Sequence, residues 1–333
     1  MIYNMEKNLD KVLLSICIPT WNRAQFLKLS LDSIKEQLKD IDDNKLEILV
    51  SDNCSTDSTS ELIKSYINDG MSIRYNCNKE NIGYDGNFLK CIQLATGKYI
   101  LLLGDDDILL LGTIKYLISI LEKDDWGLVH ISSAHSKNDV EIYTDSNECL
   151  ENIGYWITFI SANIFRSDIV PLVGNPERYY RSFFIQIPFY IKSALSCEKN
   201  IMVDRLMFDA GLDNSSNGGY NLYKVFIKSY LDIWYEFVES KEIPMSVYKS
   251  IRKNMLMKFL INYNYSVLCK RENVEKVSEK DNGRKGFAID NAWSILFHYY
   301  GKCWYFYYSL MLLPYIGLKD VVKGGLKRIG LRK

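Results

Sequence analysis

The sequence has few of the residues that build common zinc sites. Its three histidines, at positions 130, 135 and 298, are too few and too far apart for a histidine-based metal site. Its eight cysteines include no C-x-x-C pair, so zinc is not expected. No secretory signal precedes the cysteines, and we therefore expect a protein of the reducing cytoplasm.

Two familiar phosphate-binding patterns are also missing. No G-x-G-x-x-G follows the first expected strand, and no G-x-x-x-x-G-K-[ST] occurs in the chain, which argues against a dinucleotide-binding or P-loop protein. Net charge is absent, because 41 basic residues balance 41 acidic ones, so nothing global points to nucleic acid. Apolar residues make up 47% of the 333 positions, enough for one large or two modest domains.

The most informative stretch that is present is KYILLLGDDDILLL, residues 98–111. Residues 99–103 have the length and apolar character of a strand that is buried on both faces of a parallel sheet. After Gly104, the three acids Asp105, Asp106 and Asp107 would stand at the carboxyl end of this strand, where open α/β sheets bind ligands. Such carboxylates repel one another and favour a shared Mg²⁺ or Mn²⁺ ion. An acidic turn that caps the next helix is the alternative.

Strand and helix patterns alternate through the first 132 residues. Strands are expected at 13–19, 46–50, 72–75, 99–103 and 127–132, and helices at 24–38, from about 58, at 87–95 and at 113–122. This alternation predicts an α/β fold with a mostly parallel sheet and helices on both faces. A further strand is expected over 156–165, and a helix beginning near Pro188 is expected in the apolar stretch 183–195. The turns TWNR, SDNCSTD and GDDD would share one edge of the sheet, which suggests a nucleoside-diphosphate ligand.

The last third of the chain has a different character. A loop rich in Asn, Ser and Gly at 211–221 is the best boundary candidate, and the sequence after it is helical and aromatic. The stretch 293–318 has Lys302 as its only definite charge, many tyrosines, and a basic segment after it at 319–333. Aromatic and basic residues together are typical of a helix that lies on an anionic membrane surface. A helical bundle with a solvated basic end is the alternative.

Four motifs in this order resemble those of the family-2 glycosyltransferases: CIPTWNR, LVSDNCSTDST, NIGYDGNFLKCIQLATGKYI and LLGDDDIL. The resemblance is close over residues 13–130 and looser over 131–215. SDNCSTD, GDDD and the later pair Asp213 and Asn214 look most like bacterial O-antigen transferases of the abequosyltransferase kind. The resemblance implies a GT-A fold, Rossmann-like, at 13–210, with a nucleotide-sugar half at 13–130 and an acceptor half at 131–210. A frayed segment at 1–12 would precede it, and a helical, aromatic and basic region at 211–333 would follow it.

The resemblance also implies roles for individual residues of the nucleotide-sugar site. The nucleotide pocket would be lined by residues at the end of the first strand, namely Pro19, Thr20, Asn22 and Arg23. Asp52 would accept a hydrogen bond from the base, and Asn81 with Gly83 would shape the ribose and phosphate side. Turn and helix-cap chemistry is the alternative for Asp52 and Asp57, and a positive φ is the alternative for Gly83.

The acidic motif departs from the usual D-x-D-D of the family, because its first acid would fall on Gly104. The resemblance implies that Asp106 is a ligand of Mn²⁺ or Mg²⁺, that Asp107 assists it, and that Asp105 contacts the ribose or the metal. The ion would stabilise the departing diphosphate as a Lewis acid, which gives Asp106 a catalytic role.

The reaction implied is inverting transfer of a sugar from a nucleoside-diphosphate sugar to a lipid-linked or oligosaccharide acceptor, in synthesis of O-antigen or capsule. A carboxylate would take the proton of the acceptor hydroxyl. The usual acidic pair of the family is replaced by SFFIQIPFY, so the base is sought among Glu177, Asp204, Asp209 and Asp213. Asp213 is our candidate because it lies in a loop, and an ordinary turn residue is the alternative. Trp156 and Gln186 are candidate acceptor contacts, with buried structural roles as the alternative.

Two other functions fit the same features. The missing acids at positions 104 and 186 allow a catalytically inactive nucleotide-sugar-binding protein of the same fold. A nucleotidyltransferase can have a similar acidic metal site, although the glycine-rich basic loop expected after its first strand is absent. For a transferase with a lipid-linked acceptor, we expect a peripheral position on the cytoplasmic face of the inner membrane. The sequence leaves the sugar, the nucleotide and the oligomeric state open.

Overall fold

The computed structural model describes residues 12–132, 139–209, 218–269 and 286–328. The chain divides into two compact units, Met1–Asp213 and Asn214–Lys333. The first contains the strands and helices that alternate in the sequence, and the second is largely helical.

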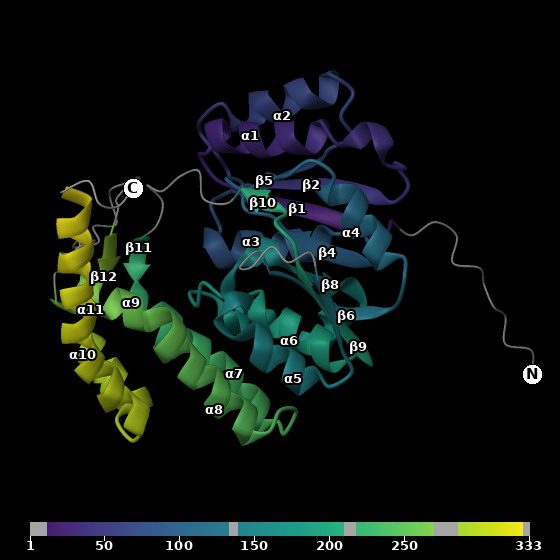
Figure 1. The fold of residues 1–333 in the computed structure, drawn as a ribbon. Coiled ribbons are helices and arrows are strands. Elements are labelled where there is room, and N and C mark those ends of the chain that lie inside the picture. Colours follow the sequence, from purple (N-terminus) through teal and green to yellow (C-terminus); the bar gives the residue numbers. More distant parts are fainter. Residues whose placement is uncertain (1–11, 133–138, 210–217, 270–285, 329–333) are drawn as a thin grey trace, which may run out of the picture. The chain divides into compact units, whose positions relative to one another are not determined.

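Unit 1 is built on an eight-stranded sheet with the order β3-β2-β1-β4-β8-β6-β9-β7 (Figure 1). Its strands are β1 (Leu14–Thr20), β2 (Leu46–Asp52), β3 (Arg74–Cys77), β4 (Tyr99–Leu102), β6 (Trp126–Ser132), β7 (Asp139–Tyr143), β8 (Asn163–Arg166) and β9 (Lys199–Asp204). β1 pairs in parallel with β2 and β4, and β2 with β3, whereas β8 is antiparallel to β4 and β6. The carboxyl ends of β1, β2 and β4 therefore lie at one edge.

Helices cover both faces of this sheet, as Figure 1 shows for α1 and α2 on one side and α3, α5 and α6 on the other. Their bounds are α1 (Ala24–Lys35), α2 (Thr59–Asn68), α3 (Gly83–Leu94), α4 (Thr113–Leu121), α5 (Ser146–Ile153) and α6 (Ile187–Leu195). α1, α2 and α4 bury their apolar stripes in one cluster with Ile16 and Ile18 of β1. Cys17 points to the opposite face, where its thiol faces the carbonyl of Cys91 in α3 at 3.9 Å. The predicted α/β class with a mostly parallel sheet is thus confirmed.

The expectation of a strand within 156–165 is largely wrong. Two short 3₁₀ turns, η2 (Gly154–Thr158) and η3 (Ile160–Ala162), occupy most of it, and only β8 at its end is extended. The Asn163 side chain stabilises the turns, because its amide donates to the carbonyl oxygens of Ile157 at 3.3 Å and Phe159 at 2.6 Å. Smaller differences are that α3 begins at Gly83 rather than at 87, that α1 ends at Lys35, and that short 3₁₀ turns add η1 (Leu38–Asp40), η4 (Ser167–Val173) and η5 (Pro176–Tyr179).

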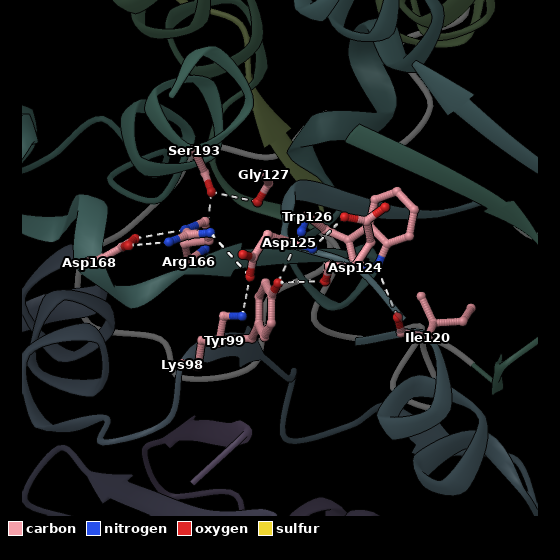
Figure 2. Close-up of polar contacts among 10 residues, drawn as sticks. All are labelled: Lys98, Tyr99, Ile120, Asp124, Asp125, Trp126, Gly127, Arg166, Asp168 and Ser193. Carbon is pink, nitrogen blue, oxygen red and sulfur yellow. Dashed lines mark hydrogen bonds and ion pairs between the residues drawn. The ribbon is translucent and has the colours of Figure 1, made fainter. Parts of the chain in front are cut away.

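The amino ends of β4 and β6, at the opposite edge of the sheet, are joined by a network of ion pairs and hydrogen bonds (Figure 2). Lys98 and Arg166 both pair with Asp125, and Arg166 also pairs with Asp168. The Tyr99 hydroxyl accepts a hydrogen bond from the backbone N–H of Trp126 at 3.0 Å. Charges at this edge therefore pair with one another, and they hold the neighbouring strands in place.

Unit 2 consists of the short pair β11 (Gly218–Asn221) and β12 (Gly286–Ala288), the helices α7 (Tyr230–Glu239), α8 (Met245–Asn254), α9 (Ile261–Asn264), α10 (Ala292–Tyr300) and α11 (Trp304–Arg328), and the π-helical turns η6 (Lys224–Ser229), η7 (Met255–Leu260) and η8 (Tyr265–Cys269). Its core is aromatic, with Trp234, Tyr230 and Phe306 fully buried. In the part of the chain that the structure describes, no helix has both the length and the apolarity needed to cross a membrane.

Candidate active site

The carboxyl ends of β1 and β4 meet in a cluster of two aspartates, an arginine and a threonine. Asp105 accepts hydrogen bonds from Thr20 Oγ1 at 2.7 Å and from Arg23 Nε at 2.9 Å. The same guanidinium reaches Asp106, whose Oδ2 lies 2.8 Å from Arg23 Nη2. Four residues that the sequence placed at the site, in two turns more than 80 positions apart, are thus brought together.

Burial controls the charge state of Asp105. Burial raises the pKa of this carboxyl to about 6, and the nearby Arg23 guanidinium and the Thr20 hydroxyl only partly offset the effect. The Asp106 side chain keeps 21% of its surface exposed, so it is the more accessible of the two carboxylates. Arg23 therefore supplies part of the positive charge that the adjacent acids require, whereas the sequence alone had suggested only a metal ion for this purpose.

Asp107 has a different environment from its two neighbours. It is 4% exposed, and its carboxylate accepts a hydrogen bond from Ser161 Oγ, which in turn accepts one from the backbone N–H of Gly104 at 3.0 Å. A Cβ atom at position 104 would lie 2.8 Å from Asp107 Oδ2 and 3.2 Å from Asp106 Oδ1. A side chain at position 104, where the common family pattern has an acid, would therefore force Asp107 to move.

A small antiparallel pair supports this acidic turn. β5 (Ile108–Leu109) pairs with β10 (Phe208–Asp209), and the backbone N–H of Leu110 donates to the Met207 carbonyl at 2.9 Å. Asp209 is the register partner of Ile108, two residues beyond Asp106. The segment that follows β9 thus returns to the acidic turn, a contact that the sequence does not reveal.

Asn22 and Asp57 join the turns that follow β1 and β2. Asn22 has a φ of 53°, and its side-chain oxygen accepts a hydrogen bond from the Thr56 N–H at 2.7 Å. Asp57 accepts from the N–H of Ala24, the first residue of α1, at 3.0 Å, and from that of Thr59, the first residue of α2, at 3.1 Å. Asp57 thus has the cap chemistry given above as its alternative.

Asp52 and Pro19 lie at the ends of β2 and β1, and both are buried. The Asp52 carboxylate accepts hydrogen bonds from the Ser55 N–H at 2.9 Å and the Tyr75 hydroxyl at 2.9 Å. The Cys77 thiol also faces Asp52 Oδ2 at 3.8 Å, so at least three of the roughly four acceptor positions are used within the protein. The expected contact with a base stays a prediction.

Asn81 and Gly83 belong to an asparagine network that the sequence analysis missed. The Asn53 amide donates to Asn81 Oδ1 at 2.8 Å and to the Gly83 carbonyl at 3.1 Å. Asn53 Oδ1 accepts from Asn78 Nδ2 at 3.1 Å, and Asn87 Nδ2 donates to the carbonyl of Ser51 in β2 at 2.9 Å. Gly83 has a φ of +79°, as its alternative interpretation required. These bonds hold the start of α3 against the carboxyl end of β2.

The predicted acceptor residues have unequal surroundings. Trp156 is 46% exposed and its ring stacks on that of Tyr155, with centroids 5.0 Å apart. Gln186 is fully buried at the start of α6, and its amide has no hydrogen-bond partner among the described residues. Of the base candidates, Glu177 lies in η5 and Asp204 ends β9, while Asp213 lies outside the described residues.

No acidic or histidine cluster in the described ranges is arranged as a ready-made metal site of three or more such side chains. Asp106 is a single accessible carboxylate next to Asp105. Mg²⁺ and Mn²⁺ are commonly held by one or two carboxylates together with substrate phosphates. The carboxylates of Asp105 and Asp106 therefore fit an ion that binds together with a phosphate-bearing substrate.

Comparison with known proteins identifies the class to which this fold and site belong. The model of the family described as Glycosyl transferase family 2 matches residues 15–190, and the chain belongs to this family. The resemblance of the four motifs is thereby confirmed.

Two similar proteins have names that state the sugar they transfer. Abequosyltransferase RfbV of Salmonella typhimurium is 34% identical over 184 residues, which cover 50% of this chain and 54% of the relative. The GalNAc(5)-diNAcBac-PP-undecaprenol beta-1,3-glucosyltransferase of Campylobacter jejuni is 33% identical over 119 residues, 35% of this chain and 36% of the relative. The chain thus matches about half or less of the length of these two proteins.

Solved structures share the fold. The crystal structure of S. aureus TarS 1-349 has a TM-score of 0.54 at 18% identity and covers 77% of this chain and 72% of its own. The same protein in complex with UDP has a TM-score of 0.56 over the same shares. At this identity the likeness supports the GT-A type of architecture.

Proposed function

We propose that this chain is a hexosyl- or deoxyhexosyltransferase that moves a sugar, with inversion, from a nucleoside-diphosphate sugar to a saccharide acceptor of bacterial surface polysaccharide. The observation that carries the proposal is the cluster in which Arg23 bridges Asp105 and Asp106 at the carboxyl edge of the sheet. Membership of the family supports the proposal. One relative is named an abequosyltransferase, and another is named for transfer of glucose to an undecaprenol-linked saccharide.

The donor would bind across the ends of β1, β2 and β4. Arg23 is partly exposed and positively charged, so it can face the diphosphate while it restrains both acids. Pro19, Asn22 and Asp52 would border the base, and Asn81 with Gly83 the ribose and phosphate side. Thr20 fixes the orientation of Asp105, which would contact the ribose or the ion.

Asp106 would hold Mn²⁺ or Mg²⁺ together with phosphate oxygens, and Asp107 would support it by keeping the turn closed on Ser161. When bound, the ion would act as a Lewis acid on the leaving diphosphate. Glycine at position 104 gives the two carboxylates the room that a side chain would take.

The chemical step would be a single displacement. A carboxylate takes the proton of the acceptor hydroxyl, the acceptor oxygen forms the new bond to the anomeric carbon, and the bond to the nucleoside diphosphate breaks. The base would come from the segment that follows β9, which holds Asp209 beside the acidic turn and our sequence candidate Asp213 farther on. Trp156 and Gln186 would contact the acceptor.

Release of nucleoside diphosphate from a panel of UDP, dTDP, CDP and GDP sugars tests the proposal. Native protein should release one nucleotide with Mn²⁺ or Mg²⁺ present, and Asp106→Asn should lower the rate by about 100-fold or more. Asp125→Asn is a matched control, because this acid also pairs with an arginine but lies at the opposite edge of the sheet (Figure 2). Equal rates in native protein and Asp106→Asn would contradict the assigned site.

Two companion measurements distinguish the alternative functions. Binding of a sugar nucleotide without turnover in any variant would indicate an inactive binding protein. Release of pyrophosphate from a nucleoside triphosphate and a sugar 1-phosphate would indicate a nucleotidyltransferase. Asp209→Asn and Asp213→Asn, compared side by side for transfer, would identify the base.

A lipid-linked acceptor would place the enzyme at the cytoplasmic face of the inner membrane, and α10 and α11 suit such a surface. Large side chains on these helices are exposed, among them Trp304 at 71% and Met311 at 70%. Lys253 Nζ lies 5.7 Å from the Trp304 ring centroid, which combines aromatic and basic character. Flotation with vesicles that contain anionic lipid should exceed flotation with neutral vesicles and should fall for Trp304→Ser; no flotation with either would contradict this part.

A further inference from the structure

Asp85 is a buried carboxylate with no part in the donor cluster described above. It lies in the first turn of α3 and is 5% exposed. It accepts hydrogen bonds from the backbone N–H groups of Phe183 at 3.2 Å and Ile185 at 3.4 Å, and it interacts with those of Arg181 and Ser182 as well. One carboxylate is thus surrounded by the amides of a segment almost 100 positions away.

The segment around Asp85 has an unusual backbone. Arg181 has a φ of 69° and Phe183 a φ of 64°, in the left-handed region that residues other than glycine rarely adopt. Each such residue costs on the order of 1 kcal/mol or more. Left-handed residues turn successive N–H groups toward one side and create an anion-binding concavity, which the Asp85 carboxylate fills. Removing this anion would leave the concavity without the partner that stabilises it.

Two routes of hydrogen bonds link the elements next to this segment to the candidate active site. The Asn53 amide holds the Gly83 carbonyl, two residues before Asp85, against the end of β2 at 3.1 Å. Beyond the segment, the Tyr190 hydroxyl donates to the carbonyl of Ile160 at 3.4 Å. The next residue, Ser161, binds the Asp107 carboxylate. Residues 181–186 are therefore linked to the site indirectly, through Asp85 and α3 to the end of β2 and through α6 to the acidic turn.

The side chains of this segment suit a saccharide. The Phe183 ring lies 5.5 Å from that of Tyr84, which is 41% exposed. Aromatic faces pack well against the apolar C–H faces of sugar rings, and ligand sites are commonly lined in this way. Gln186 adds a buried amide without a protein partner among the described residues, a cost of about 1–3 kcal/mol that a purely structural segment would avoid.

We propose that Asp85 is a positioning residue, whose carboxylate holds residues 181–186 as the acceptor-side wall of the transferase site. The inference rests on the proposed function and deepens it, because it assigns the aromatic pair Tyr84 and Phe183 to the sugar ring of the acceptor. Asp85 acts through the segment and does not touch the reacting atoms.

Asp85→Asn tests the inference, because asparagine keeps the size of the side chain and removes the charge. The donor found in the panel is supplied with p-nitrophenyl hexosides as acceptors, and both transfer and hydrolysis by water are measured. We expect at least a tenfold fall in the ratio of transfer to hydrolysis, with the Kd of the donor changed less than twofold. A loss of folding would reduce both reactions together and leave their ratio unchanged.

The matched control is Asp145→Asn. Asp145 also accepts backbone hydrogen bonds, from Asn147 at 2.8 Å and Glu148 at 3.4 Å, but it caps α5. Its ratio of transfer to hydrolysis should equal that of native protein. A second variant, Phe183→Gly, adopts the positive φ without strain and removes the ring, so it should fold and raise the acceptor KM at least tenfold.

An unchanged transfer-to-hydrolysis ratio in Asp85→Asn, or parallel loss of donor binding and transfer, would overturn the inference while native hydrolysis still supports the proposed function. Absence of donor binding and hydrolysis in native protein would overturn both.

Discussion

Replacing Arg23 with methionine should show how strongly the protein's own cation stabilises the acidic turn. The Arg23 side chain is 23% exposed and that of Asp105 only 9%. Breaking a buried ion pair costs about 3–5 kcal/mol, and the partial exposure of Arg23 reduces this to about 2–3 kcal/mol at pH 8. Hydrogen exchange of peptides from β1 and β4 measures the change within unit 1.

The pH dependence of this loss follows from the pKa of Asp105. Burial raises the pKa of Asp105 to about 6 in the folded protein, above its unfolded value. The free energy of unfolding therefore falls as pH rises from the unfolded pKa to the folded pKa, because the folded protein disfavours the ionised carboxylate. From an unfolded pKa of about 3.9, the decrease is roughly 3 kcal/mol, complete above the folded-state pKa. Asp105→Asn should remove this slope. The Arg23→Met loss should be smaller at pH 5, where Asp105 is largely protonated.

A double-mutant cycle measures the interaction between Arg23 and Asp105. Arg23→Met with Asp105→Asn should cost less than the sum of the single changes, by about 1–3 kcal/mol at pH 8, because the neutral amide no longer requires a cation. Losses that add within 0.5 kcal/mol, roughly the scatter expected of independent sites, and that do not vary with pH would refute the reasoning.

Three further variants test single contacts. Burial lowers the pKa of His130 to about 4. The free energy of unfolding of native protein, measured with urea, should therefore be highest above about pH 6.5 and lower by roughly 2 kcal/mol at pH 5. The same measurement on His130→Gln should show no such fall between about pH 6.5 and pH 5. Gly104→Ala should lower the melting temperature and nucleoside-diphosphate release together, because its Cβ would meet Asp107 Oδ2 at 2.8 Å; native values for both would contradict this. Tyr99→Phe should cost about 1–3 kcal/mol by leaving the buried Trp126 N–H unpaired, seen as faster exchange of that amide (Figure 2).

The position of the acidic turn could be predicted from sequence, because an apolar strand that ends in three aspartates has few possible places in a parallel sheet. The same logic brought Thr20 and Arg23 to the edge where Asp105 lies. The pairing of Arg23 with both acids could not be predicted, since it depends on side-chain directions. Asp107 was grouped with its neighbours because its partner Ser161 is 54 positions away.

The other features that could not be predicted from the sequence depend on contacts between residues that lie apart in the chain. Asp85 stands within the quoted motif NIGYDGN, yet its role appears only when residues 181–185 surround it. Asn53 joins Asn78 and Asn81, which lie 25 and 28 positions away in the connection between β3 and α3, and no local pattern marks their meeting. The 156–165 stretch has the apolar content of a strand. The Asn163 side chain, however, donates hydrogen bonds to the carbonyl oxygens of Ile157 and Phe159, and so stabilises 3₁₀ turns in its place.

The most direct test of the account is a crystal structure of the protein with the sugar nucleotide found in the panel and Mn²⁺. We predict that the diphosphate contacts the Arg23 guanidinium beside its ion pair with Asp106, with the base toward Asp52. A sugar nucleotide bound away from the carboxyl ends of β1, β2 and β4 would contradict the central claim.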